Sequence, residues 1–500
     1  MPWVIRTGHV LRDASATLEQ ADVLIDRDRI AAIAPTLQVS ADVQEIDAHA
    51  GIVMPGLINA HTHAHNNLLR NLAHSWTLED LLNRGTALYS QRSPEDQYLS
   101  AARGAVEMVK SGCTAAYDLF TELPIPTDEG VEAVVHAYTD VGLRAVVAPS
   151  FADMVFYHVL PGLRERLPEA LKRQVDAMVA APTKSLLDLT THAIQRWHGF
   201  AEGRIQVAVS PTIPGHCTDA LLAGCAALAR EHGVGLHTHL VETKIEAVQA
   251  RQRWGKSIAA HLADIGLLGP RFVGAHSVWL ADEDIRRIAD TGGSVAHNPV
   301  SNLKLGCGLA PIRELLDHGV QVGLGTDGAM SSDNLNMFEA MRFAGVVGNI
   351  RFPHRTDRWV DGITALRLAT EGSAHLLGLG SGSGRLEPGG KADLVVLRSA
   401  TGFLRPLNDP VNALVYCETG ADVDLVMIDG RIVVRNGQVQ TVDEAQLCAR
   451  AQRAADAARE RNRTAWAVAD HLQPYVTGAC QALVATAFPV NRYAVPIPTA

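Results

Sequence analysis

The chain has 500 residues, of which 47% are hydrophobic and 20% charged, a composition typical of an ordinary globular protein rather than a disordered or fibrous one. Its formal net charge of −10 at pH 7 argues against the basic surface that nucleic-acid binding requires and favours a small-molecule substrate. Seven cysteines without a C-x-x-C pair fit neither a disulfide framework nor a thiolate zinc finger, and we expect buried thiols in a reducing compartment.

Both ends of the sequence are rich in short strand-like segments. Residues 1–53 contain apolar runs that flank the charged segment Asp26–Arg29, a pattern typical of strands joined by turns. Similar runs return in residues 386–440, where Asp429-Gly430 is a hairpin signal. We therefore predict one small β-sandwich domain built from both chain ends.

The middle of the chain, residues 54–385, alternates short β-branched runs with longer helical stretches, which indicates parallel strands joined by helices. Eight such runs occur, namely "GLINAHTH", "CTAAYDLF", "LRAVVAPSF", "RIQVAVSPT", "VGLHTHLVE", "RFVGAHSVWL", "GSVAHNPVSN" and "VQVGLGTDG". They predict an α/β fold, a closed (β/α)8 TIM-like barrel with its active site at the carboxyl ends of the strands.

Two further segments stand out beside the barrel. The interval from Phe151 to Arg204 is too long for one helix with its connections, so we expect an insertion or lid over the barrel mouth, with "ADMVFYHVLPGL" near the pocket. Residues 441–500 are predicted to form a C-terminal helix and tail, the helix spanning 443–472. Its charges are expected to form a solvated or subunit-contacting face.

Polar residues lie at the predicted carboxyl ends of four strands. They are His61 and His63 after the first strand, His239 and Glu242 after the fifth, His276 after the sixth, and Asp327 after the eighth. Each signal is weak alone, because H-x-H is common by chance, but a barrel brings these ends into one ring. Three imidazoles and a carboxylate suit Zn²⁺ or Fe²⁺ with one position left for water. His65 lies beyond its strand and His237 one pleat deeper than His239, so we expect them to pack or to support ligands.

The motifs "PGLINAHTH", "HTHLVET", "GAHSVWL", "SVAHNPVSNLKLGCGLAPI" and "LGTDGAMSSDNLNMFEAMR" resemble the amidohydrolase superfamily. More narrowly, they resemble its metal-dependent aminohydrolases and chlorohydrolases, which include deaminases of nucleobases and adenosine-type compounds and enzymes that attack s-triazine rings. The resemblance implies that His61, His63, His239 and Asp327 hold the metal. It also implies that His276 contacts the metal-bound water or the substrate, and that Glu242 shuttles protons.

The chemistry agrees with this assignment. A metal lowers the pKa of bound water towards ~7, and Asp327 is placed to accept the proton of that water. Glu242 can protonate the ring or leaving nitrogen if burial raises its pKa; the alternative is an exposed acid that starts the next helix.

The sequence departs from the family pattern at the fourth strand. Adenosine-type deaminases of this branch typically carry a His-Ala-Pro-Tyr-like motif there, whereas this chain reads "VSPTIPGHCTDALL", which weakens a nucleoside assignment. His216 is a candidate substrate contact, or a solvated or capping loop residue. Trp76 is a candidate to stack on a flat ring, or a packing residue. Ser331, like its neighbours Ser332 and Asn334, either hydrogen-bonds the substrate or caps the next helix.

The fourth strand also bears on the metal count. Binuclear relatives need a bridging carboxylated lysine or glutamate there, and "RIQVAVSPT" contains neither, since Ser210 and Thr212 are neutral. Lys184 and Lys244 lie on other segments. We therefore predict one divalent metal ion per chain, zinc in preference to iron.

The leading functional hypothesis is hydrolytic deamination of a heterocyclic amidine or ring-amino compound. One alternative uses the same site to cleave an amide, urea or carbamate bond, or for s-triazine dechlorination or dealkylamination. A second is a non-catalytic binding protein, which the complete set of His, Glu and Asp residues disfavours.

The N-terminus lacks a signal-peptide pattern and no run of 18 apolar residues occurs, so we predict a cytoplasmic protein without a membrane span. The resemblance further suggests a homo-oligomer.

Overall fold

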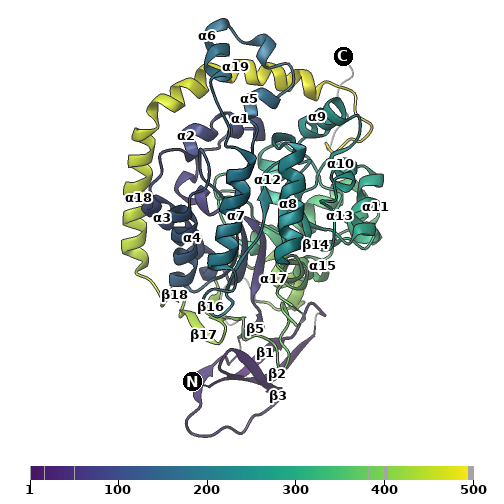
Figure 1. Cartoon of the computed structure of the whole chain (residues 1–500). Helices are drawn as coiled ribbons and strands as arrows, with labels where there is room; N and C mark the ends of the chain where they lie inside the picture. Colours follow the sequence, from purple (N-terminus) through teal and green to yellow (C-terminus); the bar gives the residue numbers. More distant parts are fainter. Residues whose placement is uncertain (1, 16, 50, 381, 399–403, 494–500) are drawn as a thin grey trace.

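The computed structural model describes residues 2–15, 17–49, 51–380, 382–398 and 404–493. Parallel strands surround the centre of the molecule in two ladders (Figure 1). The first ladder consists of β6 (Leu57–Thr62), β7 (Cys113–Thr121), β8 (Arg144–Phe151), β9 (Ile205–Val207) and β10 (Ser210–Pro211), and the second of β11 (Leu236–Leu240), β12 (Phe272–His276), β13 (Ser294–His297) and β14 (Gln321–Leu324). Backbone bridges between Thr62 and Asp327 and between Val209 and Leu236 join the ladders. The predicted barrel is confirmed, with the fourth strand split into two short pieces.

Helices surround the barrel or lie at its mouth. They are α1 (Leu78–Asn83), α2 (Gly85–Tyr89), α3 (Pro94–Lys110), α4 (Asp128–Val141), α8 (Asp219–His232), α9 (Lys244–Trp254), α10 (Ile258–Asp264), α11 (Asp282–Thr291), α12 (Pro299–Lys304), α13 (Ile312–Asp317), α14 (Met337–Val347), α15 (Gly362–Arg367), α16 (Ser373–Leu376) and α17 (Pro410–Tyr416). In α3, a capping box between Ser93 and Asp96 sets the first turn. Its apolar face, with Leu99 and Val106 fully or nearly fully buried, belongs to the main core. Packing of such amphipathic faces, rather than helix propensity, supplies most of the stability of these helices.

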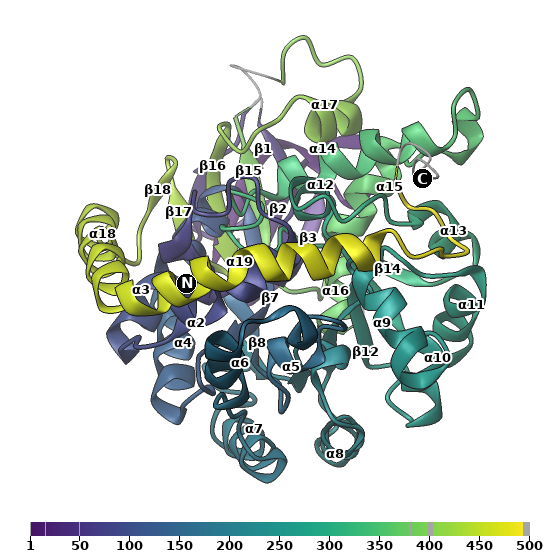
Figure 2. The ribbon, with the colours of Figure 1, turned by 90° about the horizontal axis from the view of Figure 1, so that it is seen from above.

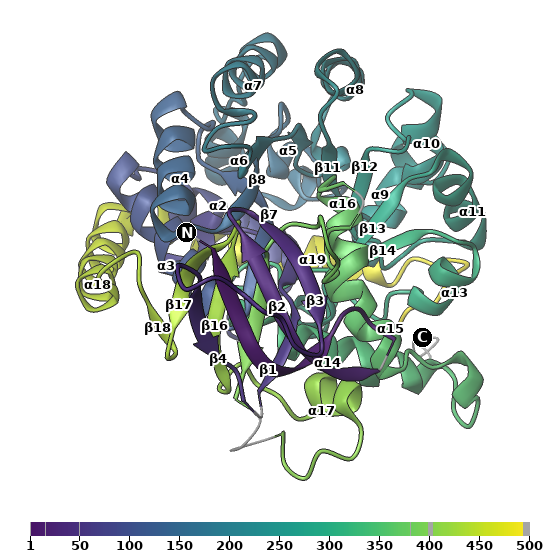
Figure 3. The same cartoon turned by 90° about the horizontal axis from the view of Figure 1, so that it is seen from below.

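A nine-stranded sheet lies below the barrel and contains segments from both chain ends (Figure 3). Its members are β1 (Trp3–Leu11), β2 (Leu18–Asp26), β3 (Arg29–Ala34), β4 (Gln44–Asp47), β5 (Ile52–Pro55), β15 (Leu394–Leu397), β16 (Val423–Ile428), β17 (Arg431–Arg435) and β18 (Gln438–Val439). Strand β5 joins the two ends, because it pairs with both β1 and β15. The predicted small β domain from both termini is thus confirmed. The boundaries at 53, 385 and 440 stay a prediction, and β5 crosses the first of them.

A buried ion-pair cluster fastens this sheet to the barrel. The Arg144 guanidinium, at the start of β8, lies 3.0 Å from Asp393 Oδ2 and 2.7 Å from Asp429 Oδ1. Asp393 precedes β15 and Asp429 lies in the hairpin after β16, so one barrel side chain contacts two loops of the sheet. Removing Arg144 would leave Asp393 without its counter-charge, whereas Asp429 would keep the Lys391 ammonium at 3.0 Å.

The C-terminal segment corrects one prediction. Instead of one helix over 443–472, the chain forms α18 (Glu444–Arg461) and α19 (Arg463–Val484), which turn at Asn462. Asn462 is buried, and its Nδ2 donates to the Ser90 carbonyl at 3.0 Å, which fixes the turn against the barrel. Helix α19 continues past Pro474 because Leu472 and Val476 are fully buried there, and that burial offsets the hydrogen bond that proline removes. Residues 494–500 of the predicted tail lie outside the described residues.

Helix α19 crosses the barrel mouth, beside the segment between β8 and β9 (Figure 2). That segment is the predicted insertion and forms α5 (Phe156–Val159), α6 (Glu169–Asp176) and α7 (Thr183–Trp197). Side chains of α5, α6 and α19 share one apolar cluster, which includes Tyr157, Val175 and Val476. None of the helices in the described part of the chain combines the length and apolar content that a membrane crossing requires.

Candidate active site

A cavity of about 470 Å³ lies at the carboxyl ends of the barrel strands. Its polar lining comes from strand ends and includes His63, His239, Glu242, His276 and Asp327. The structure therefore brings together the side chains that the sequence places at four separate strand ends, and His61, which closes β6, lies beside them. All six are buried.

Two of the histidines are oriented by backbone carbonyls. The Nδ1–H of His63 donates to the Leu119 carbonyl at 2.8 Å, and that of His239 to the Thr212 carbonyl at 2.6 Å. These bonds fix the tautomer, so each ring directs the lone pair of its Nε2 towards the other, with 3.2 Å between the two Nε2 atoms. Two lone pairs at this distance repel each other unless a cation lies beside them.

His61 and Asp327 complete the cluster. Asp327 Oδ1 lies 3.1 Å from His63 Nε2 and 3.6 Å from His61 Nε2. Burial lowers the pKa of His61 to about 3, so this imidazole is neutral. Burial also acts to raise the pKa of Asp327, but the adjacent His61 and His63 imidazoles lower it well below its usual range. Burial acts to lower the pKa of His63, but Asp327 raises it. The cluster thus combines imidazole nitrogens with one carboxylate.

This donor set fits a divalent metal ion. The ligand nitrogens of His61, His63 and His239 lie within 4.8 Å of one another. The ligand atoms of a second group, His61, His276 and Asp327, also lie within 4.8 Å of one another. Neither ring nitrogen of His61 has a hydrogen-bond partner among the described residues, although the ring is fully buried. Buried polar atoms are almost always satisfied in folded proteins, so such an atom points to a missing partner. Neutral imidazole with carboxylate is a usual ligand set for zinc.

Glu242 and His276 lie next to this cluster. Glu242 Oε2 is 3.5 Å from His276 Nε2, and the His276 Nδ1–H donates to Asn302 Oδ1 at 2.8 Å. Burial raises the pKa of Glu242 well above its usual range, and the negative charges of Asp327 and Glu246 act in the same direction. A carboxyl group that is protonated near neutral pH can serve as a general acid.

The backbone at these strand ends is strained. Four non-glycine residues there have positive φ angles, namely Val241 at 40°, His276 at 65°, Ser277 at 51° and Asp327 at 61°. This region is costly for residues with a Cβ, above all for a β-branched valine. Such strain persists where the surrounding fold fixes the backbone, and it is found most often at functional sites.

Two of the three predicted substrate contacts line the cavity. His216 and Ser331 line the cavity, and burial, with the nearby Arg253 charge, lowers the pKa of His216 to about 4. Ser331 Oγ also donates to Asp327 Oδ2 at 2.8 Å, so it orients that carboxylate. Trp76 is absent from the described lining residues and instead packs on Trp466 of α19, with ring centroids 6.2 Å apart.

The two histidines predicted to have supporting roles also differ. His237 lies below His61 and packs edge-to-face on Tyr117, with ring centroids 4.5 Å apart. His65 packs on Tyr89 at 4.8 Å, and its Nδ1 accepts from the Thr121 N–H at 3.0 Å. Beyond the predicted packing, His65 lines the cavity.

The far end of the cavity is apolar. Its lining comes mainly from the insertion and from α1, and includes Leu78, Leu81, Leu82, Met154, Val155, Phe156, Tyr157, Met178 and Val179. This agrees with the expectation that the insertion approaches the pocket. Sequence reasoning identified the segment but not which of its side chains enter the cavity, because no periodic pattern marks a short irregular insertion.

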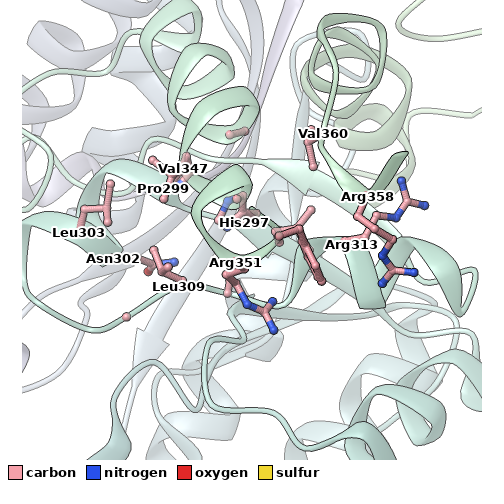
Figure 4. A pocket seen from close by; sticks show the side chains of 16 residues that line it. His297, Pro299, Asn302, Leu303, Leu309, Arg313, Val347, Arg351, Arg358 and Val360 are labelled. Carbon is pink, nitrogen blue, oxygen red and sulfur yellow. The ribbon is translucent and has the colours of Figure 1, made fainter. Parts of the chain in front are cut away.

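A second hollow, of about 20 Å³, is lined by residues that include His297, Asn302 and Arg351 (Figure 4). It has room for about one water molecule. Its arginines are already paired, Arg351 with Glu314 at 2.5 Å and Arg358 with Asp317 at 2.7 Å. Asn302, which lines this hollow, makes the bond to His276. The hollow therefore belongs to the support of the main site and does not suit a substrate.

The sequence pattern of the amidohydrolase family matches residues 52–433. The chain belongs to the amidohydrolase family. A 5'-deoxyadenosine deaminase of Methanothermobacter thermautotrophicus is 33% identical to this amidohydrolase over 453 residues, which cover 90% of the chain and 98% of that relative. A 5-methylthioadenosine/S-adenosylhomocysteine deaminase of Thermococcus kodakarensis is 35% identical over 436 residues, covering 87% and 94%. The predictions of the family and of a metal-dependent hydrolytic deaminase are confirmed.

Solved structures agree with this assignment. An atrazine chlorohydrolase of Arthrobacter aurescens TC1, complexed with zinc, has a TM-score of 0.80 and 27% identity, covering 91% of this amidohydrolase and 100% of that chain. An adenosine deaminase of Xanthomonas campestris with bound zinc has a TM-score of 0.79 and 26% identity, covering 92% and 98%. A metal in the site is therefore supported.

One expectation from the fourth strand needs correction. The departure at "VSPTIPGHC" does not separate the chain from adenosine-type deaminases, because relatives with that activity match most of its length. Thr212 orients His239 through its backbone carbonyl, a contact that does not depend on the side chain at that position.

Proposed function

We propose that this amidohydrolase removes the ring amino group of an adenosine-type nucleoside as ammonia. The observation that carries the proposal is the position of Glu242, a buried acid beside the histidine cluster and at the wall of a large cavity. Deamination needs a proton donor of this kind, since a ring carbon accepts a nucleophile more readily once its neighbouring nitrogen is protonated.

In this proposal His61, His63, His239 and Asp327 hold one divalent ion, zinc in preference to iron. The ion, when bound, supplies a nucleophile by lowering the pKa of a water molecule. Both lysines near the fourth strand have other partners, since Lys184 pairs with Asp188 and Lys244 Nζ donates to the Val484 carbonyl. With Ser210 and Thr212 on that strand, no described side chain there is suited to bridge a second ion.

The metal count is open to direct measurement. Elemental analysis of active, chelator-washed protein should give close to one zinc per chain. Activity that rises in proportion to a second equivalent of metal would contradict the single-ion site.

The protons are handled by the chain's own carboxyl groups. Glu242 gives a proton to the ring nitrogen next to the carbon that carries the amino group, and Asp327 takes one from the attacking water. His276, held by Asn302, keeps Nε2 towards Glu242 and the cavity. A C–O bond forms, Asp327 passes the proton that it took from the water to the amino group, and the C–N bond breaks to release ammonia. The remaining hydroxyl proton returns to Glu242 as the ring carbonyl forms.

The far end of the cavity narrows the substrate class. No lysine or arginine occurs among the described residues that line it, and most of those residues are apolar. A phosphate or a free carboxylate would lose its hydration there without gaining a counter-charge. We therefore propose a substrate whose group at the 5' position is small and uncharged, as in 5'-deoxyadenosine or 5'-methylthioadenosine.

Ammonia release from a substrate panel tests this proposal. We expect kcat/KM to be highest for 5'-deoxyadenosine and 5'-methylthioadenosine, and much lower for S-adenosylhomocysteine and for adenosine 5'-phosphate. Turnover of acyclic amides or ureas alone would contradict deamination, and preference for the phosphate would contradict the apolar end.

A second candidate is displacement of chloride or an alkylamine from an s-triazine. The likeness to a zinc-bound atrazine chlorohydrolase and the apolar cavity favour it. Chloride or alkylamine release from substituted triazines, with no ammonia from nucleosides, would establish this alternative instead.

Assembly is a separate proposal. We propose that the chain forms a homo-oligomer through the terminal sheet and α18. Sedimentation at micromolar concentration should show a dimer or a larger species, and a monomer would contradict the proposal.

A further inference from the structure

A cysteine holds one of the two carboxyl oxygens of Glu242. The Cys307 thiol donates to Glu242 Oε1, with 3.4 Å between Sγ and the oxygen. Both side chains are almost fully buried, Cys307 at 2% exposure and Glu242 at 1%. A thiol is a weak donor, but inside a protein a weak bond still selects one side-chain orientation when water cannot compete.

This hydrogen bond determines which carboxyl oxygen of Glu242 is free to face the substrate. With Oε1 held by Cys307, Oε2 points towards His276 Nε2, 3.5 Å away. Glu242 lines the cavity, whereas Cys307 is absent from the described lining residues and so lies behind it. Cys307 therefore touches the acid from the side opposite the substrate.

The loop that carries Cys307 is itself fixed on several sides. The Cys307 N–H donates to the Asn302 carbonyl at 2.8 Å, and the Trp279 indole N–H donates to the Cys307 carbonyl at 2.8 Å. Two residues further on, the Leu309 N–H donates to the Arg492 carbonyl at 2.7 Å, which ties the loop to the C-terminal segment. The thiol is thus presented by a rigid backbone, and a rigid support is what keeps a catalytic group in place.

The other buried cysteines do not make such a contact. Cys113 Sγ donates to the Ala115 carbonyl, and among the described cysteines Cys307 alone donates its thiol to a carboxyl group. Simple packing of a small apolar side chain accounts for Cys225 in the core of α8, but it does not explain a thiol directed at a catalytic acid.

We propose that Cys307 is a positioning residue that keeps Glu242 Oε2 directed at the substrate during proton transfer. The proposal rests on the proposed role of Glu242. Cys307 contacts neither the substrate nor the metal in this proposal. Its hydrogen-bond donor is therefore expected to matter more for kcat than the sulfur atom itself.

Four variants test the proposal. Cys307→Ala and Cys307→Val remove the donor, and valine also fills the volume that alanine leaves empty. Both should lower kcat about fivefold to tenfold, the size expected for one modest hydrogen bond, with KM and zinc content unchanged. Cys307→Ser keeps a donor and should restore kcat to within about twofold. Cys225→Ala, a buried cysteine away from the site, should leave kcat unchanged.

A double-mutant cycle separates this inference from the proposed function. In a Glu242→Gln background, Cys307→Ala should have little further effect, because the group that it orients no longer transfers a proton. A full additional loss in that background would overturn the proposal, as would wild-type kcat in both Cys307→Ala and Cys307→Val, or no recovery with serine. If Glu242→Gln alone kept wild-type activity, the proposed function would fail first.

Discussion

At the inner end of the cavity the polar atoms come from strand ends, whereas at the outer end the lining comes from an insertion and from loop helices. The inner groups are held by short contacts to the backbone, such as His63 to the Leu119 carbonyl and His239 to the Thr212 carbonyl. The outer side chains, such as Phe156 and Met178, are half-buried and lie on short helices or connecting segments. In a barrel enzyme, the rigid strands fix the chemistry and the loops select the substrate.

The largest expected effect comes from removing a proposed metal ligand at the inner end. His61→Ala or Asp327→Ala should lose the metal and reduce activity to background, because the remaining groups no longer form a complete site. Zinc content and ammonia release would be measured on the same samples. The control is His74→Ala, an exposed histidine on the loop after β6, which should keep both. Retention of metal by both ligand variants would show that the cluster is not a metal site.

Glu242→Gln should separate metal binding from proton transfer. The amide has nearly the same shape but cannot give up the proton, so kcat should fall by about 10² to 10⁴ while zinc content stays the same. Glu418→Gln is a matched control, since Glu418 is also buried but lies after α17 and is not among the described residues that line the cavity. Activity of Glu242→Gln within a few-fold of wild type would contradict the acid role, and loss of metal would make Glu242 a ligand.

The inner end was largely predictable from sequence, because its signals are tied to strand ends. His61 and His63 alternate along one strand, and Asp327 follows another, so the barrel topology alone brings them together. Cys307 and Asn302 were not identified as support, because a contact between a loop and a strand end distant in sequence leaves no local pattern. The outer end was predictable as a segment only, and the sequence left Trp76 between stacking on the substrate and packing; the structure shows it packed on Trp466.

A change at the outer end of the cavity should alter substrate selectivity without changing metal binding. Phe156→Ala should lower kcat/KM about tenfold for substrates with an apolar substituent, the size expected for losing a partly buried aromatic contact. Substrates without that substituent should change less, and zinc content should not change. Phe200→Ala, on a residue outside the cavity, serves as the control. An equal loss for all substrates would mean that Phe156 supports the fold and does not select the substrate.

The smallest effect on catalysis is expected at Trp76, which packs in one apolar cluster with the cavity residues Tyr89 and Leu81 but is not among the described residues that line the cavity. The Arg84 guanidinium lies over the Trp76 ring at 4.6 Å, and Trp466 of α19 packs on it, so the indole joins the loop after β6 to the C-terminal helix. Trp76→Ala should therefore lower the free energy of unfolding by about 1–2 kcal/mol through lost packing and cation–π contact. Because the ring is not among the described lining residues, kcat and KM should stay within about twofold of wild type. Urea unfolding and steady-state kinetics on the same preparation distinguish the two roles. A tenfold rise in KM with unchanged stability would show that the indole contacts the substrate. The loop after β6 would then also contribute to substrate selection.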